Sequence, residues 1–246
     1  NTLSNYINNG ICPDIYEHGG VGASGDLVQL AHLALGIIGE GKGVNNKDEK
    51  DHISKLIKES NLQPHKLELR DGLAMINGTA CMTALSAINI INSKILIKWS
   101  VKISAMMLEI FGSYDDYISK ELNQVKLHDG QNEIALRIRN ILETSSLITN
   151  RYSGEDKNFQ EFYSVRCTPQ VLGPILDTIN FSELVVENEI NSADDNPIVD
   201  VDNQKIVHGG NFHGDYISLE MDKLKIAITK LTMLTERQLN LLLNSK

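Results

Sequence analysis

The sequence lacks any block of Lys and Arg residues. Its 23 basic residues stand against 32 acidic ones, which gives a formal net charge of −9. This charge argues against a partner rich in phosphate, either nucleic acid or an anionic membrane surface. The chain also does not open with the basic, apolar and small-residue segments of a secretory signal, so secretion is not supported.

Cysteine is scarce as well. Cys12, Cys81 and Cys167 are odd in number, widely spaced and without the paired spacing of a metal site. Free thiols in a reducing cytoplasm are the simplest interpretation, and it predicts a cytoplasmic protein without a metal. Cys81 and Cys167 are expected to be buried and unreactive.

A long apolar run is also missing. The longest charge-free run, Gly72 to Ser93, contains several Asn, Thr and Ser residues and is too polar to face lipid. The hydrophobic content of 41% and the charged content of 22% are ordinary for a soluble globular protein. The composition therefore predicts a soluble protein without a membrane partner.

What the sequence does contain is helical periodicity. The expected helices cover residues 1–9, 27–40, 79–111, 117–125, 131–143, 168–187 and 215–244, and residues 71–79 lead into the longest of them. A helix of some 33 residues would span about 50 Å, which is typical of a bundle of long helices. We expect both ends of the sequence to continue in a longer chain, because neither carries a signal that starts or stops its helix.

One small β-hairpin is expected, formed by residues 198–201 and 205–207 around Asp202-Asn203. The polar segment Gly41 to Lys66, with one short amphipathic piece at Ile53, Leu56 and Ile57, is expected on the surface. The predicted fold class is therefore all-α, a bundle of long helices with one hairpin. Residues 1–246 are predicted to form a single helical unit that divides into 1–70 and 71–246.

The glycine-rich turn from Gly19 to Asp26 is the most informative stretch. Its glycines allow backbone turns that other residues cannot adopt. Ala23-Ser24-Gly25 can cyclise there and lose two waters, which leaves an electrophilic methylene. A tripeptide of this kind occurs by chance in about one chain of this size in ten. However, the helix expected from Leu27 would place about half a positive charge beside it.

Five blocks of sequence, the first of which overlaps this turn, occur in order along the chain. They are Gly22-Ala23-Ser24-Gly25-Asp26-Leu27, Ile76-Asn77-Gly78-Thr79, the run from Tyr163 to Pro174, Asn191-Ser192 with Asp195-Asn196-Pro197, and Gly209-Gly210-Asn211-Phe212-His213-Gly214. With these blocks the chain resembles the aromatic amino acid ammonia-lyases, which include histidine, tyrosine and phenylalanine ammonia-lyases and related aminomutases. It reads closest to bacterial tyrosine and histidine ammonia-lyases.

The resemblance implies a fumarase/aspartase-like bundle that assembles as a homotetramer, with active sites that combine residues from several subunits. It implies that Ala23, Ser24 and Gly25 form the 4-methylideneimidazole-5-one group (MIO) autocatalytically, without a metal. This part of the chain, 1–70, would then be the MIO-bearing part. The substrate would be a small-molecule amino acid.

The resemblance also implies roles for five side chains. Asn77 would hydrogen-bond near the ring or the substrate amine, and Arg166 would bind the substrate carboxylate in bidentate fashion. Tyr163 and Gln160 would line the same pocket, and Phe212 would pack beside the prosthetic group. Each also has an ordinary structural interpretation: a helix cap for Asn77, an ion pair for Arg166, and core packing for Tyr163 and Phe212.

The reaction implied is the non-oxidative deamination of tyrosine or histidine to ammonia and a trans-α,β-unsaturated acid. Two alternatives stay open. One is an MIO-dependent aminomutase, which returns the ammonia to the neighbouring carbon. The other is a catalytically incomplete helical scaffold, because no block matches the loop that carries the catalytic base in the family.

Overall fold

A computed structural model describes residues 2–20, 26–153 and 160–244. The chain divides into two compact units. The first comprises Asn1–Leu85 and Asn188–Asp215, and the second comprises Ser86–Glu187 and Tyr216–Lys246.

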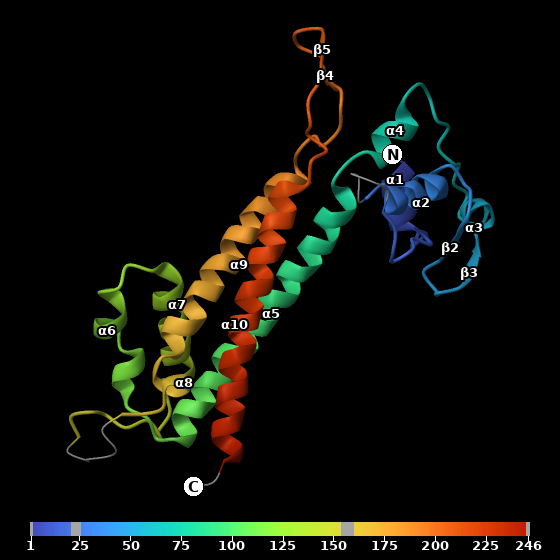
Figure 1. The fold of residues 1–246 in the computed structure, drawn as a ribbon. Coiled ribbons are helices and arrows are strands. Elements are labelled where there is room, and N and C mark those ends of the chain that lie inside the picture. The colour runs from blue at the N-terminus through green and yellow to red at the C-terminus, as the bar shows by residue number, and fades with distance from the viewer. Residues whose placement is uncertain (1, 21–25, 154–159, 245–246) are drawn as a thin grey trace. The chain divides into compact units, whose positions relative to one another are not determined.

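Most described residues are helical (Figure 1). The helices are α1 Thr2–Asn8, α2 Leu27–Ile37, α3 Ile53–Glu59, α4 Asp71–Ile76, α5 Ala80–Ile110, η1 Asp115–Ile118, α6 Lys120–Gln124, α7 Asp129–Leu142, α8 Tyr163–Arg166, α9 Thr168–Ile190 and α10 Asp215–Leu243. The strands are β1 Cys12–Pro13, β2 Lys42–Val44, β3 Lys50–His52, β4 Ile198–Asp200 and β5 Lys205–Val207. The predicted all-α class and the predicted hairpin are confirmed.

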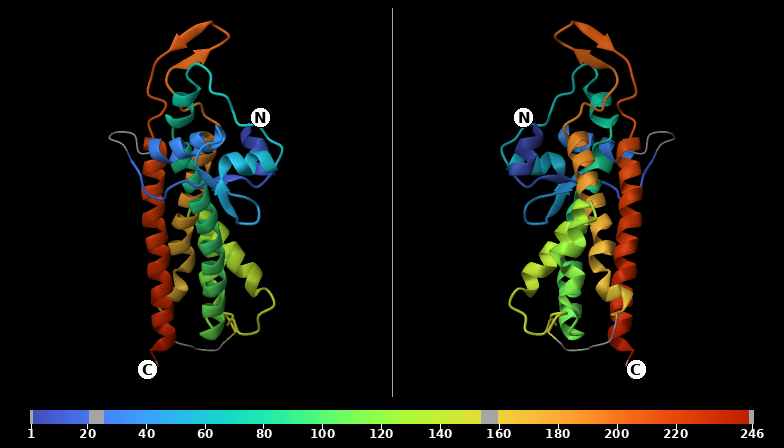
Figure 2. Two further views of the ribbon diagram at one scale, coloured as in Figure 1. Left: turned by 90° about the vertical axis from the view of Figure 1, so that its right-hand side faces the viewer. Right: turned by 90° about the vertical axis from the view of Figure 1, so that its left-hand side faces the viewer.

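In the second unit, α5, α9 and α10 lie side by side (Figures 1 and 2). Their shared core includes Ile97, Leu172 and Leu224, which are almost completely buried. A buried hydrogen bond of 2.8 Å from Ser182 Oγ to Glu220 Oε2 joins α9 to α10. The three long helices therefore pack through apolar residues at helical spacing, and a few buried polar contacts fix which faces meet.

Helix α7 crosses α9 at two glycines. A Cβ atom on Gly130 would lie 2.3 Å from the Gly173 carbonyl oxygen, and one on Gly173 would lie 2.6 Å from Gln131 Cα. The two backbones can approach this closely only because neither position carries a side chain. This crossing sets the position of the first turns of α9, which follow α8 directly in the chain.

The first unit contains a second sheet that the sequence does not predict. Strands β1, β2 and β3 form an antiparallel sheet in that order, with β4–β5 as a separate antiparallel pair. The prediction of one β element was wrong in this respect. Strands of two or three residues are too short to show alternation, and their pairing depends on contacts with distant segments.

The expectation that residues 41–66 lie on the surface was also wrong for its amphipathic piece. Ile53, Leu56 and Ile57 are almost completely buried on α3, where they form a core cluster with Tyr6 and Ile11. The helix predicted from their spacing is present. Its partner surface comes from Tyr6 on α1 and from Ile11 after that helix, and the local sequence pattern does not reveal this contact.

By length and composition alone, the stretch Asp71–Ile110 could cross a membrane, and it is the one such stretch among the described residues. This is weak evidence, because a long core helix of a soluble protein passes the same test. In the second unit, α5 and α10 carry many exposed apolar side chains: Ile88, Ile91, Ile95, Leu96, Trp99, Met106, Ile110, Tyr216, Leu219, Ile226, Met233, Leu239, Leu242 and Leu243.

Candidate active site

The tripeptide predicted to form the ring, Ala23-Ser24-Gly25, lies outside the described residues. The residue that follows it, Asp26, is described and accepts two hydrogen bonds. Asp26 Oδ2 accepts a hydrogen bond of 2.8 Å from the Met82 backbone nitrogen in the first turn of α5. The Asp26 carbonyl also accepts the Leu30 amide at 3.0 Å, which starts α2. Asp26 is thus attached to the N-terminal turns of both α2 and α5.

Asn77 lies between α4 and α5 and is half-buried. Its Nδ2 donates to Asp195 Oδ1 at 3.4 Å. Its side chain does not cap α5, which removes the ordinary interpretation that the sequence allowed. The cap comes instead from Asp194, whose Oδ2 accepts the Thr79 amide at 2.7 Å. Gly78 makes room for this carboxylate, since a Cβ there would lie 2.6 Å from Asp194 Oδ2.

Arg70 is a site residue that sequence reasoning missed. Its Nη1 lies 3.2 Å from Asp195 Oδ2, and its Nη2 donates to the Asn196 carbonyl at 2.8 Å. Nη1 also donates to the Pro197 carbonyl at 3.3 Å. The signal that could have indicated this contact is the Asp195-Asn196-Pro197 block itself, because a carboxylate in a defined turn needs a cationic or N–H partner.

The turn from Gly209 to Gly214 packs against the loop of residues 191–197. Asn211 Nδ2 donates to the Ala193 carbonyl at 3.2 Å, and the Gly209 amide donates to Asn196 Oδ1 at 2.8 Å. Phe212, on this turn, keeps 40% of its surface exposed and is not a core residue within this chain. The first unit therefore gathers the Asn77 turn, the 191–197 loop and the Phe212 turn, which are far apart in sequence.

The other predicted residues belong to the second unit. Tyr163 is 73% exposed, so it is not a core residue within this chain. Its ring centroid lies 5.2 Å from Arg166 Cζ, a cation–π distance. Arg166 forms no ion pair with the described residues, and its buried Nε–H has no hydrogen-bond partner among them. Gln160 is exposed.

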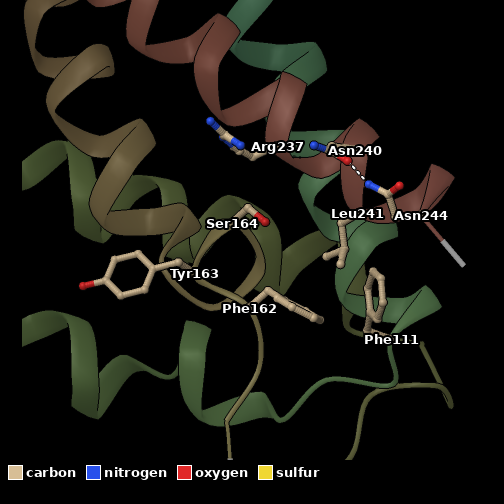
Figure 3. Close-up of a pocket in the computed structure, with 8 residues that line it drawn as sticks. All are labelled: Phe111, Phe162, Tyr163, Ser164, Arg237, Asn240, Leu241 and Asn244. Atoms are coloured by element: carbon tan, nitrogen blue, oxygen red, sulfur yellow. Dashed lines mark hydrogen bonds between the residues drawn. The ribbon is translucent and has the colours of Figure 1, made fainter. Parts of the chain in front are cut away.

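Helix α8 borders a cavity of about 590 Å³ lined by Phe111, Phe162, Tyr163, Ser164, Arg237, Asn240, Leu241 and Asn244 (Figure 3). Phe162, Phe111 and Leu241 turn toward one another, while the Tyr163 ring points away from them (Figure 3). Gln238, which is buried on α10, donates to the Ser164 carbonyl and to Ser104 Oγ, each at 3.0 Å. These contacts fix the backbone between Tyr163 and Arg166.

Neither unit by itself holds all the predicted site residues. Asn77 and Phe212 lie in the first unit, whereas Gln160, Tyr163 and Arg166 lie in the second. Among residues 2–20, 26–153 and 160–244, no group of three or more His, Cys, Asp or Glu side chains is placed to hold a metal ion.

The thiols of Cys81 and Cys167 are partly buried rather than fully buried. Burial raises the pKa of both thiols. For Cys167, the nearby Arg166 guanidinium acts in the opposite direction but is the smaller effect. A raised pKa leaves less thiolate near neutral pH, so the low reactivity of both cysteines stays a prediction.

The long helices and their polar entry turns define the class of protein. The same arrangement of long helices is found in the all-α, fumarase-like lyases. Over 99% of this chain, the fold matches the crystal structure of tyrosine aminomutase from Streptomyces globisporus with a TM-score of 0.88 and 32% sequence identity. The sequence profile described as aromatic amino acid lyase matches residues 1–246. The chain belongs to the aromatic amino acid lyase family.

Two relatives show the range of the similarity. Histidine ammonia-lyase from Myxococcus xanthus (strain DK1622) is 40% identical over 239 residues, which are 97% of this chain and 46% of that protein. Tyrosine 2,3-aminomutase from Chondromyces crocatus is 34% identical over 258 residues, which are 98% of this chain and 48% of that protein. The chain spans about half the length of the curated relatives it matches and 48% of the matched aminomutase structure.

Proposed function

We propose that the protein carrying this chain removes ammonia from an aromatic amino acid, histidine or tyrosine, and releases a trans-α,β-unsaturated acid. The observation that supports this most directly is the 2.8 Å hydrogen bond between Asp26 and the Met82 amide. It attaches the residue after Ala23-Ser24-Gly25 to the same helix start that Asn77 precedes. Asp26, which follows the tripeptide, and Asn77 thereby both lie at the start of α5.

The described residues fit an MIO group made from Ala23, Ser24 and Gly25. The α2 N-terminus begins directly after the tripeptide, and its unpaired N–H groups favour negative charge there. Asn77 offers an amide oxygen that accepts no hydrogen bond from a described residue. When present, the group supplies an electrophilic methylene carbon for departure of the amine.

Arg166 is proposed to bind the substrate carboxylate. A buried donor without a partner costs free energy, and the Arg166 Nε–H is such a donor among the described residues. A carboxylate would satisfy it and match the planar guanidinium. Tyr163 and Gln160 are proposed to line the pocket beside it, since Tyr163 is exposed at the start of α8 and Gln160 is exposed just before it. Phe212 is proposed to pack beside the prosthetic group.

We propose a homotetramer in which several copies complete each active site. Two observations support this proposal. The predicted site residues are divided between two units of the chain. In addition, α5 and α10 expose apolar residues over much of their length, and a second copy could cover them. A cytoplasmic location is proposed with it, on the basis of the free cysteines and the acidic composition.

An aminomutase is the second candidate, and the 34% identity to tyrosine 2,3-aminomutase favours it. As an aminomutase, the protein carrying this chain would return the ammonia to the neighbouring carbon of the substrate. Product analysis with L-tyrosine separates the two activities, because the lyase gives an unsaturated acid and the aminomutase gives a β-amino acid.

Intact-mass measurement tests the proposal. We expect a deficit of two waters in the parent protein and its loss in Ser24→Ala, together with loss of deamination. Ser4→Ala, which changes another serine in the same unit, is the matched control and should keep both the deficit and the activity. An unmodified mass in a correctly folded parent would refute the proposed chemistry and leave a non-catalytic scaffold.

A further inference from the structure

The orientation of the Asn77 amide is determined by the group that faces it. Asn77 Nδ2 lies 3.4 Å from Asp195 Oδ1. An ionised carboxylate only accepts hydrogen bonds, so the NH₂ end of the amide must point toward it. The Asn77 oxygen, on the other branch of the planar amide, then points away from Asp195. It accepts no hydrogen bond from any residue in the described part of the chain.

Arg70 holds the Asp195 carboxylate in place. Its two terminal nitrogens reach both carboxylate oxygens, Nη1 to Oδ2 at 3.2 Å and Nη2 to Oδ1 at 3.5 Å. The same guanidinium donates to the carbonyls of Asn196 and Pro197. Because the guanidinium is planar and makes four contacts, it fixes the rotation of the carboxylate as well as its position.

The backbone around Asn77 is fixed by different residues. The Asn77 amide donates to the Leu73 carbonyl at 2.9 Å, and Asp194 holds Thr79 at the start of α5. The main chain of Asn77 is therefore set without Asp195. What remains for Asp195 to set is the direction of the Asn77 side-chain amide.

We propose that Asp195 and Arg70 are positioning residues that turn the Asn77 oxygen toward the ammonium group of the amino acid substrate. This inference rests on the proposed function and adds to it how the substrate amine is recognised. An amide oxygen held outward is a neutral acceptor for an ammonium group, whereas a freely rotating amide would present its NH₂ end for part of the time.

The test uses binding in the Ser24→Ala protein, which is expected not to turn over. Calorimetry measures Kd for L-histidine or L-tyrosine, whichever the parent deaminates. The companion ligand is the saturated acid of the same skeleton without the amine: 3-(imidazol-4-yl)propionate or 3-(4-hydroxyphenyl)propionate. Asp195→Asn and Asn77→Ala are made singly and together, and Asp200→Asn on the β4–β5 hairpin is the matched control.

We expect Asp195→Asn to weaken binding of the amino acid about tenfold and binding of the amine-free acid less than about twofold. Asn77→Ala should do the same, and the double variant should bind no more weakly than Asn77→Ala alone. Asp200→Asn should bind both ligands as the parent does. A purely structural role for Asp195 would weaken both ligands alike.

Equal losses for the two ligands, or losses that add in the double variant, would overturn the inference. Arg70→Gln provides the same comparison if Asp195→Asn does not fold. A parent protein that deaminates neither amino acid would refute the proposed function and this inference with it. An active parent with equal losses would refute only the inference.

Discussion

Replacement of Gly173 by Ala tests the packing that places α9 at its start. Gly173 is buried in α9, and a Cβ there would lie 2.6 Å from both Cα and N of Gln131 on α7. These are backbone atoms of a helix, so they cannot rotate away as the end of a flexible side chain could. The two helices would have to move apart.

The magnitude follows from two opposing effects. Overpacking a close contact costs about 1–3 kcal/mol, and a contact with backbone atoms belongs near the upper end of that range. Ala gains about 1 kcal/mol over Gly in a helix interior. We therefore expect Gly173→Ala to lower the free energy of unfolding by about 2 kcal/mol.

Urea unfolding of the chain, followed by circular dichroism at one fixed protein concentration, measures this change. Gly72→Ala is the matched control, because Gly72 lies in α4 and a Cβ there would have no heavy atom within 4 Å. The control should be unchanged or stabilised by up to about 1 kcal/mol. If both variants were equally stable, the inferred close contact between α7 and α9 would be refuted.

Three further predictions concern α8 and the cysteines. Arg166→Ala in the complete protein should raise KM for the amino acid at least about tenfold and leave the two-water mass deficit intact; unchanged KM would show that Arg166 does not bind the carboxylate. Gln238→Met should lower the free energy of unfolding by about 1–3 kcal/mol in urea, since it removes the buried amide that donates to Ser104 Oγ and to the Ser164 carbonyl, and leaves that carbonyl with the Thr168 hydroxyl as donor; unchanged stability would refute that role. The raised pKa of Cys167 predicts that a thiol reagent labels exposed Cys12 first near neutral pH, with labelling of Cys167 accelerating as the pH rises; peptide mass spectrometry gives both rates, and earlier labelling of Cys167 would contradict burial of its thiol.

Much of the fold could be predicted from the sequence, because a helix is indicated by the spacing of apolar residues within a short stretch of the chain. Apolar spacing indicated α2, α5, α9 and α10 with ends close to those observed. Hairpin β4–β5 was also predictable, since its strands flank a turn of Asp and Asn. The β1–β2–β3 sheet was not, because strands of two or three residues carry no periodic signal.

The candidate site was predictable to a different degree. The ordered blocks pointed to Asn77, Tyr163 and Arg166, and the family comparison agrees with the resemblance on which those assignments depend. Nothing local identified Arg70 as a partner of Asp195. Such a contact is formed by segments far apart in sequence, and neither segment shows it alone.

The sequence by itself determined the helical segments, the position of the Ala23-Ser24-Gly25 motif in the chain and the membership of the lyase family. Each of these depends on residues that are neighbours in the chain or recur in a fixed order. Only the tertiary structure decided that Asp195 faces Asn77, 118 residues away in sequence, and that Asp26 holds the α5 turn at Met82. Hydrogen bonds need donor and acceptor atoms within about 3.5 Å, and only the folded backbone brings such distant residues that close.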